Sequence, residues 1–139
     1  MQHEVILRFC IWGFEDILPE NITQLLDINP SKIYVKGKQM NSINPRIAKG
    51  NGWIIDSSLD KYAPFEDQME ALLDILEPKI DLLKPLCEKY YCEFSCAIFM
   101  RYDNGESLPS IHLGSRYNKL TKELNIEFDI DLYNLPNES

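Results

Sequence analysis

The sequence predicts a single α+β domain, a two-layer sandwich in which a mixed or antiparallel sheet of about four to six strands packs against about two to three helices. Segments with alternating apolar residues are interspersed with segments whose apolar residues recur every three or four positions. The length of 139 residues, of which 45% are hydrophobic, suits one core. We therefore expect one domain over residues 1–135 and a frayed tail over residues 136–139.

The start of the chain predicts a strand followed by a short helix. His3–Trp12 places apolar residues on both faces of an alternating pattern, around the single charge of Arg8, so we expect a central strand that is covered on both sides. A buried arginine needs a carboxylate partner, for which Glu93 or Asp129 would serve, unless it anchors a ligand. Pro19 suits the first position of the helix that follows.

A polar loop separates the second and third predicted strands. Lys32–Lys38 and Trp53–Ser57 carry apolar residues in the strand pattern. Between them lies the polar stretch Gln39–Asn51, which contains a proline and a glycine. This loop is long enough to be mobile or functional.

The longest predicted element is a helix that begins at Pro64. Acidic residues in its first turns suit the helix dipole, and an apolar stripe at helical spacing follows them. The stripe consists of Met69, Leu72, Leu73, Leu76, Ile80, Leu83 and Cys87. Pro78 interrupts the stripe, so we expect a kink or two abutting helices.

The last third of the chain predicts strands around another helix. Tyr91–Arg101 is the fourth predicted strand, and the turn residues Asp103–Gly105 follow it. Ile111–Leu113 predicts a short strand, Ser115–Leu124 a helix capped by its serine, and Ile126–Tyr133 a final strand. The strand–helix–strand succession near each end of the chain is a weak pseudo-repeat, and a ferredoxin-like arrangement would accommodate it.

The charge of the chain narrows its possible partners. A net charge of −8 and a pI near 4.7 argue against a protein that neutralises phosphates, so we expect no nucleic-acid partner. No apolar run is long enough to cross a bilayer and the start makes a poor signal peptide, so we expect no membrane contact and a cytoplasmic location. All charged residues between Asp27 and Asp56 are basic, whereas acidic residues outnumber basic ones in the segment that follows, Asp60–Glu77. The candidate partner-binding residues in that segment are Glu66, Asp67, Glu70, Asp74 and Glu77.

Three of the four cysteines lie within Leu86–Cys96. In a strand, Cys92 and Cys96 share a face with apolar neighbours, and Cys87 lies on the apolar stripe of the long helix. Their spacing lacks the paired arrangement of a zinc site. We therefore expect buried thiols that fill the core, and predict no metal and no cofactor.

The rest of the sequence contains few candidates for catalytic or cation-binding residues. No motif of nucleophilic catalysis, phosphate binding or metalloproteases occurs, so we predict no catalytic residue. His112, beside Ser110 and Ser115, could act as a base, although a structural role is the commoner one. Three acids share one face of the last predicted strand, where they could hold a cation or block association of sheet edges: Glu127, Asp129 and Asp131.

Several short motifs occur in a fixed order along the sequence and resemble the pattern of a known family. They include RFCIWG, LPENITQLLDINPSKIYVKGK, GNGWIIDS, SIHLGS and FDIDLY. Together they resemble a bacterial family known as domain of unknown function 4279 along nearly the whole chain. The positions that match its pattern are Pro19, Thr23, Leu26, Pro30, Gly37, Trp53, Gly114, Asp131 and Tyr133. The resemblance implies a small α+β domain in a bacterial cytosolic protein, and it carries over no catalytic residues; the cysteines are not part of its pattern.

Two functions fit these observations. The first is a non-enzymatic interaction protein, immunity- or antitoxin-like, whose acidic surface binds a basic partner protein. The alternative is a small-molecule-binding or catalytic domain in which Gln39–Asn51 forms a lid over a pocket near Arg8, Trp53, Tyr133 and Asp131. A homodimer is a further possibility, because the acidic last strand could pair around a two-fold axis.

Overall fold

The fold is a five-stranded mixed sheet with helices on one face, which confirms the predicted class. The computed structural model describes residues 1–40 and 46–138. The strands, in the sheet order β2-β3-β1-β4-β5, are β2 (Lys32–Tyr34), β3 (Gly52–Asp56), β1 (Glu4–Trp12), β4 (Tyr91–Tyr102) and β5 (Glu127–Pro136). Neighbouring strands are antiparallel except β4 and β5, which are parallel.

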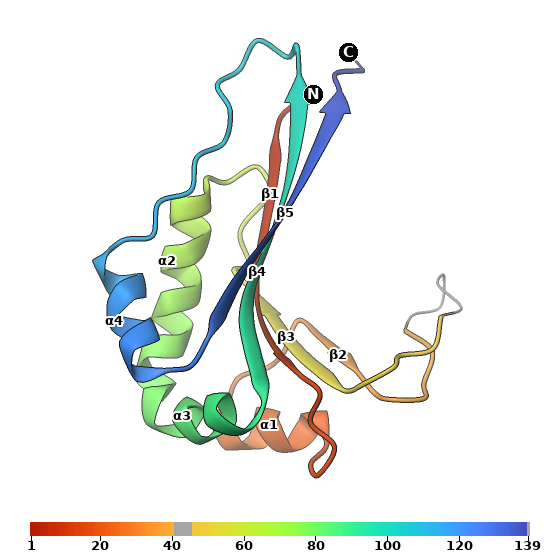
Figure 1. The fold of residues 1–139 in the computed structure, drawn as a ribbon, viewed down its shortest axis with the longest axis vertical. Helices are drawn as coiled ribbons and strands as arrows, with labels where there is room; N and C mark the ends of the chain where they lie inside the picture. The colour runs from red at the N-terminus through yellow and green to blue at the C-terminus, as the bar shows by residue number, and fades with distance from the viewer. Residues whose placement is uncertain (41–45, 139) are drawn as a thin grey trace.

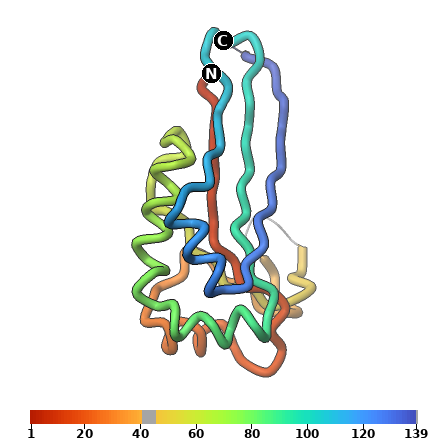
Figure 2. Tube along the Cα trace, turned by 60° about the vertical axis from the view of Figure 1, so that its left-hand side comes forward, coloured from red at the N-terminus to blue at the C-terminus, as the bar shows by residue number. Residues whose placement is uncertain are grey.

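The helices form the second layer, all on the same side of the sheet (Figure 1; Figure 2). They are α1 (Pro19–Leu26), α2 (Phe65–Leu76), the 3-10 turn η1 (Glu77–Lys79), α3 (Ile80–Lys89) and α4 (Ser115–Glu123). The predicted interruption at Pro78 is confirmed, because η1 contains this proline and separates α2 from α3. No helix of the described residues is long and apolar enough to cross a bilayer.

The topology is ferredoxin-like with one added strand. The first six elements run β1, α1, β2, β3, the α2–α3 segment and β4, and their strands take the antiparallel order β2-β3-β1-β4. Helix α4 then crosses back over the sheet, so β5 lies parallel to β4. The weak internal repeat corresponds to β1–α1–β2 and β4–α4–β5; in the first unit β3 lies between the two parallel strands.

The core lies between the sheet and the helices. Val5, Leu7, Phe9 and Ile11 of β1 are buried on the helix side, in register with apolar residues of β4. The prediction that β1 is covered on both sides is wrong, because no helix of the described residues lies on the opposite face and Arg8 is exposed there. We call that uncovered side the open face.

Several local predictions also need correction. Ile111–Leu113 forms no strand, and the N-cap of α4 is Gly114 without a side-chain cap, so Ser115 is the first helical residue. The second strand ends at Tyr34 because the chain turns at Gly37, where φ is 85°. In the expected tail, Pro136 belongs to β5, and Asn137 accepts a hydrogen bond from the amino terminus at 2.7 Å.

The buried side chain of a glutamine connects α2 to the central strand. β3 pairs with β1 only from Arg8 to Trp12, so the first half of β1 has a backbone edge without a strand beside it. Gln68 of α2, 2% exposed, lies against this edge. Its Oε1 accepts from the Leu7 amide at 3.1 Å, and its Nε2 donates to the Val5 carbonyl at 2.7 Å and to the Ala63 carbonyl at 3.0 Å. The amide therefore takes the place of a strand.

Replacing Gln68 with leucine tests this role. The change keeps a similar volume but leaves the buried Leu7 amide and Val5 carbonyl without partners, at about 1–3 kcal/mol each. We expect Gln68→Leu to lower the free energy of unfolding in urea by about 2–4 kcal/mol. The neighbouring exposed Asp67→Asn is the control and should change it by no more than about 0.5 kcal/mol. A Gln68→Leu protein as stable as this control would contradict the assignment.

Candidate binding surfaces

The acidic residues expected to bind a partner lie along α2 and at its end, but two of them are already paired with an arginine of the same chain. Arg116 of α4 donates to Asp74 Oδ1 at 2.7 Å and to Glu77 Oε1 at 3.1 Å. The hydrogen bond to Glu77 raises the pKa of Arg116 further above its usual range, and the bond to Asp74 adds to this effect. Glu66, Asp67 and Glu70 are exposed and form no ion pair with a described residue. The free acidic surface on α2 is therefore smaller than the sequence indicates.

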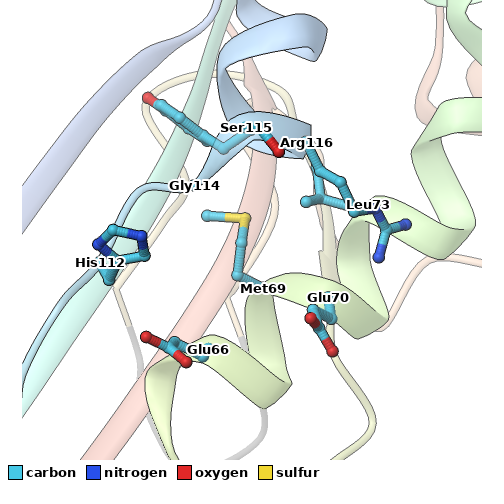
Figure 3. A pocket seen from close by; sticks show the side chains of 9 residues that line it. Glu66, Met69, Glu70, Leu73, His112, Gly114, Ser115 and Arg116 are labelled. Carbon is cyan, nitrogen blue, oxygen red and sulfur yellow. The ribbon is translucent and has the colours of Figure 1, made fainter.

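A shallow pocket of about 310 Å³ lies between α2 and the start of α4. Figure 3 shows Glu66 and Glu70 rising from α2 on either side of Met69, with His112 facing Glu66. Among the described residues, no hydrogen bond connects His112 with Ser110 or Ser115.

The last strand, β5, presents an acidic row on the open face. It lies at the edge of the sheet, next to β4 only. The row consists of Glu127, Asp129 and Asp131, all exposed and all without an ion-pair partner among the described residues. Glu93 of β4 is in register with Glu127 and extends the row. The open face at this edge therefore has a concentrated negative charge.

The negative charge affects a neighbouring phenol. The Tyr91 hydroxyl donates to Glu93 Oε2 at 3.0 Å. Loss of hydration beside β4, then this hydrogen bond and the charges of Glu93, Asp129 and Glu127, raise the pKa of Tyr91 to about 12. A basic group brought to this edge would relieve the repulsion.

β5 also exposes apolar side chains. On the helix side, Ile130 and Leu132 are 43% and 62% exposed, because the helices do not extend over this part of the sheet (Figure 1). On the open face, Tyr133 stacks on Phe99 of β4 with ring centroids 4.7 Å apart. The strand thus combines an apolar row, an acidic row and a free backbone edge.

The four cysteines are all buried, which confirms their predicted role as core residues. Burial raises the pKa of Cys10 to about 12, with the charge of Glu93 adding to it, and raises that of Cys96 to about 11. A hydrogen bond with Cys87, followed by burial, raises the pKa of Cys92. Among the described residues, no group of three or more histidine, cysteine, aspartate or glutamate side chains could hold a metal ion.

The residues of the alternative pocket are not brought together. Arg8, Asp131 and Tyr133 lie on the open face, but Trp53 lies on the helix side, fully buried. Its indole nitrogen donates to Thr23 Oγ1 of α1 at 3.0 Å, so Trp53 is a core residue. Arg8 forms no ion pair with a described residue and is paired in the register with Asp56 and Ser95. Part of the proposed lid, residues 41–45, lies outside the described residues.

Comparisons with known proteins assign the chain to a family. The family model described as Domain of unknown function (DUF4279) matches residues 3–135, which is nearly the whole chain. No curated protein and no solved structure matches it.

The thiols should be unreactive while the protein is folded. The thiolate is the nucleophile, and the thiols of Cys96 and Cys10, whose pKa values are raised to about 11 and 12, are almost entirely protonated at pH values near 8. The hydrogen bond with Cys92 lowers the pKa of Cys87, so the protection of this thiol rests on its burial, with 1% of the residue exposed. We expect an aromatic disulfide reagent to label none of the four cysteines within minutes in native protein near pH 8, and all four in denaturant. Rapid labelling of Cys92 or Cys96 in folded protein would contradict the core assignment.

Proposed function

Because the chain belongs to the family described as Domain of unknown function (DUF4279), a description that assigns no activity, we propose its function from its surface: a non-enzymatic interaction protein that binds a basic partner protein. The finer form of the proposal is an immunity- or antitoxin-like role in the bacterial cytoplasm, with a toxin as the partner. The net charge of −8 supports a basic partner.

The observation that carries the proposal is the free edge of β5. Its acidic row has no ion-pair partners among the described residues, and its apolar row is exposed. A strand at a sheet edge can accept another strand through its backbone N–H and C=O groups. Side chains then set the specificity, because alternate residues face opposite sides of the sheet.

The two faces of β5 define the partner segment. Lysine or arginine residues beside Asp129 and Asp131 would form cross-strand ion pairs on the open face. Apolar residues at the alternate positions would cover Ile130 and Leu132 on the helix side. The proposed binding segment is therefore an extended stretch in which basic and apolar residues alternate. The free acids of α2 would add to long-range attraction.

A second copy of the chain fits this edge less well. Two β5 strands paired around a two-fold axis would bring the acidic rows of both copies to one seam. Like charges on facing strands destabilise the pairing. The edge therefore favours a basic partner over self-association.

Two matched variants test the proposal. The first is Glu127→Gln/Asp129→Asn/Asp131→Asn in β5, and the second is Glu66→Gln/Asp67→Asn/Glu70→Gln in α2; each removes three negative charges. Immobilised wild-type protein should retain a basic protein from a lysate of the source cells at low salt. The β5 variant should retain about tenfold less or none, and the α2 variant nearly as much as wild type, because only β5 forms the contact.

The same comparison can fail in distinct ways. If no basic protein is retained by wild type at low salt, the interaction function is wrong. If the α2 variant loses the partner and the β5 variant keeps it, the partner binds through α2 and the assignment to β5 is wrong. Equal losses would indicate non-specific attraction to net charge, which also contradicts the proposal.

A further inference from the structure

A large hollow lies on the open face, at the far end of the sheet from β5. After β2, residues 36–40 and 46–48 run antiparallel as a ribbon, through hydrogen bonds that include Gly37 to Ala48, Ala48 to Lys38 and Met40 to Arg46. We call this ribbon the arm. It projects away from the side that carries the helices (Figure 1). A cavity of about 890 Å³ lies between the arm and the sheet.

The base of the arm is fixed by a buried asparagine. Asn51, 9% exposed, donates through Nδ2 to the Phe14 carbonyl at 2.7 Å and accepts from the Lys36 amide at 2.8 Å. Its backbone carbonyl accepts from the Gly13 amide at 2.9 Å. These bonds tie the arm to the end of β1, so the cavity exists before any ligand binds.

One wall of the cavity is an aromatic platform. The rings of Trp12 and Tyr34 are stacked, with centroids 5.7 Å apart and planes inclined by 21°. Gly52 lies between them in the sheet, and a Cβ there would come within 2.5 Å of the Trp12 ring, so only glycine allows this placement. The indole N–H of Trp12 donates to Glu93 Oε1 at 3.0 Å, which fixes the ring. The platform is therefore preorganised and half-exposed.

The rest of the cavity lining combines apolar and cationic side chains. Met40 and Ile47 line the cavity from the arm, and Ile47 is 61% exposed. Lys49 and Arg46 also line the cavity, and none of its described lining residues is an aspartate or glutamate. Lys49 forms no ion pair with a described residue. In a chain with a net charge of −8, this is a locally basic site.

We propose that this cavity is a binding site for a planar aromatic compound that carries an anionic group. The ring would lie against the Trp12–Tyr34 platform, where stacking gives the contact its geometry. The carboxylate, sulfonate or phosphate would face Lys49 and Arg46, since a charge-assisted hydrogen bond is stronger than a neutral one. The volume lies within the range of small-molecule sites. The site is distinct from β5, and it replaces the sequence-based pocket around Trp53.

Three small probes separate the contribution of the aromatic ring from that of the anionic group. Naphthoate has the ring and the charge, naphthalenemethanol has only the ring, and cyclohexanecarboxylate has only the charge. In amide and indole NMR spectra, naphthoate should shift the Trp12 indole signal and the amides of residues 47–51, and leave the Trp53 indole signal in place. It should bind about tenfold more tightly than either other probe.

A variant that lacks the positive charge at position 49 completes the test. Lys49→Gln should weaken naphthoate about three- to tenfold and leave naphthalenemethanol unchanged, because only the ion contact is lost. Lys119→Gln, on exposed α4, is the matched control and should have no effect. The proposal is overturned if naphthoate causes no shift up to about millimolar concentration, if the shifts lie elsewhere, or if Lys49→Gln binds naphthoate like the control.

Discussion

The contact between Gln68 and the backbone of β1 sets the arrangement of the two layers. β3 is short and leaves half of the central strand without a neighbouring strand on that side, and buried backbone groups require partners. Gln68 supplies them from α2, which holds the long helix against this half of the sheet. The contact fixes α2 on the face of the sheet that also carries the other helices. The other face of a five-stranded sheet remains uncovered, and both proposed binding sites are on it or at its edge.

The open face separates charge, although its acidic residues belong to β5 and not to the acidic segment that forms α2. The basic stretch between β2 and β3 becomes the arm at one end, and the acids of β5 lie at the other end. Arg8 lies between them, exposed, in register with Ser95 of β4 and hence with Asp129 of β5. The two ends therefore suit ligands of opposite charge, a basic strand at β5 and an anionic ring at the arm.

Periodicity predicted most of the fold because the helices and the long strands β1 and β4 each bury one face. The stripe of α2 and α3, the break at Pro78 and the buried cysteines follow from spacing alone. The sequence pattern places Arg8 on a covered face because its neighbours on that face include the apolar residues Cys10 and Trp12. In the structure Cys10 is indeed buried there, between Ile54 and Glu93 in the register. Trp53 was assigned to a pocket because local sequence does not show which face of the sheet a strand residue occupies. Gln68 could have been suspected, since it precedes Leu72 by four residues and lies on the same helix face.

The free outer edge of β5 is the feature on which the proposed function depends. Residue-resolved hydrogen exchange on the protein alone measures it directly, because alternate amides of an edge strand point toward its neighbour and away from it. We expect alternating slow and fast exchange along residues 127–135, the slow amides being those bonded to β4. Uniformly slow exchange along β5, which would mean that the edge is already covered, would contradict the account.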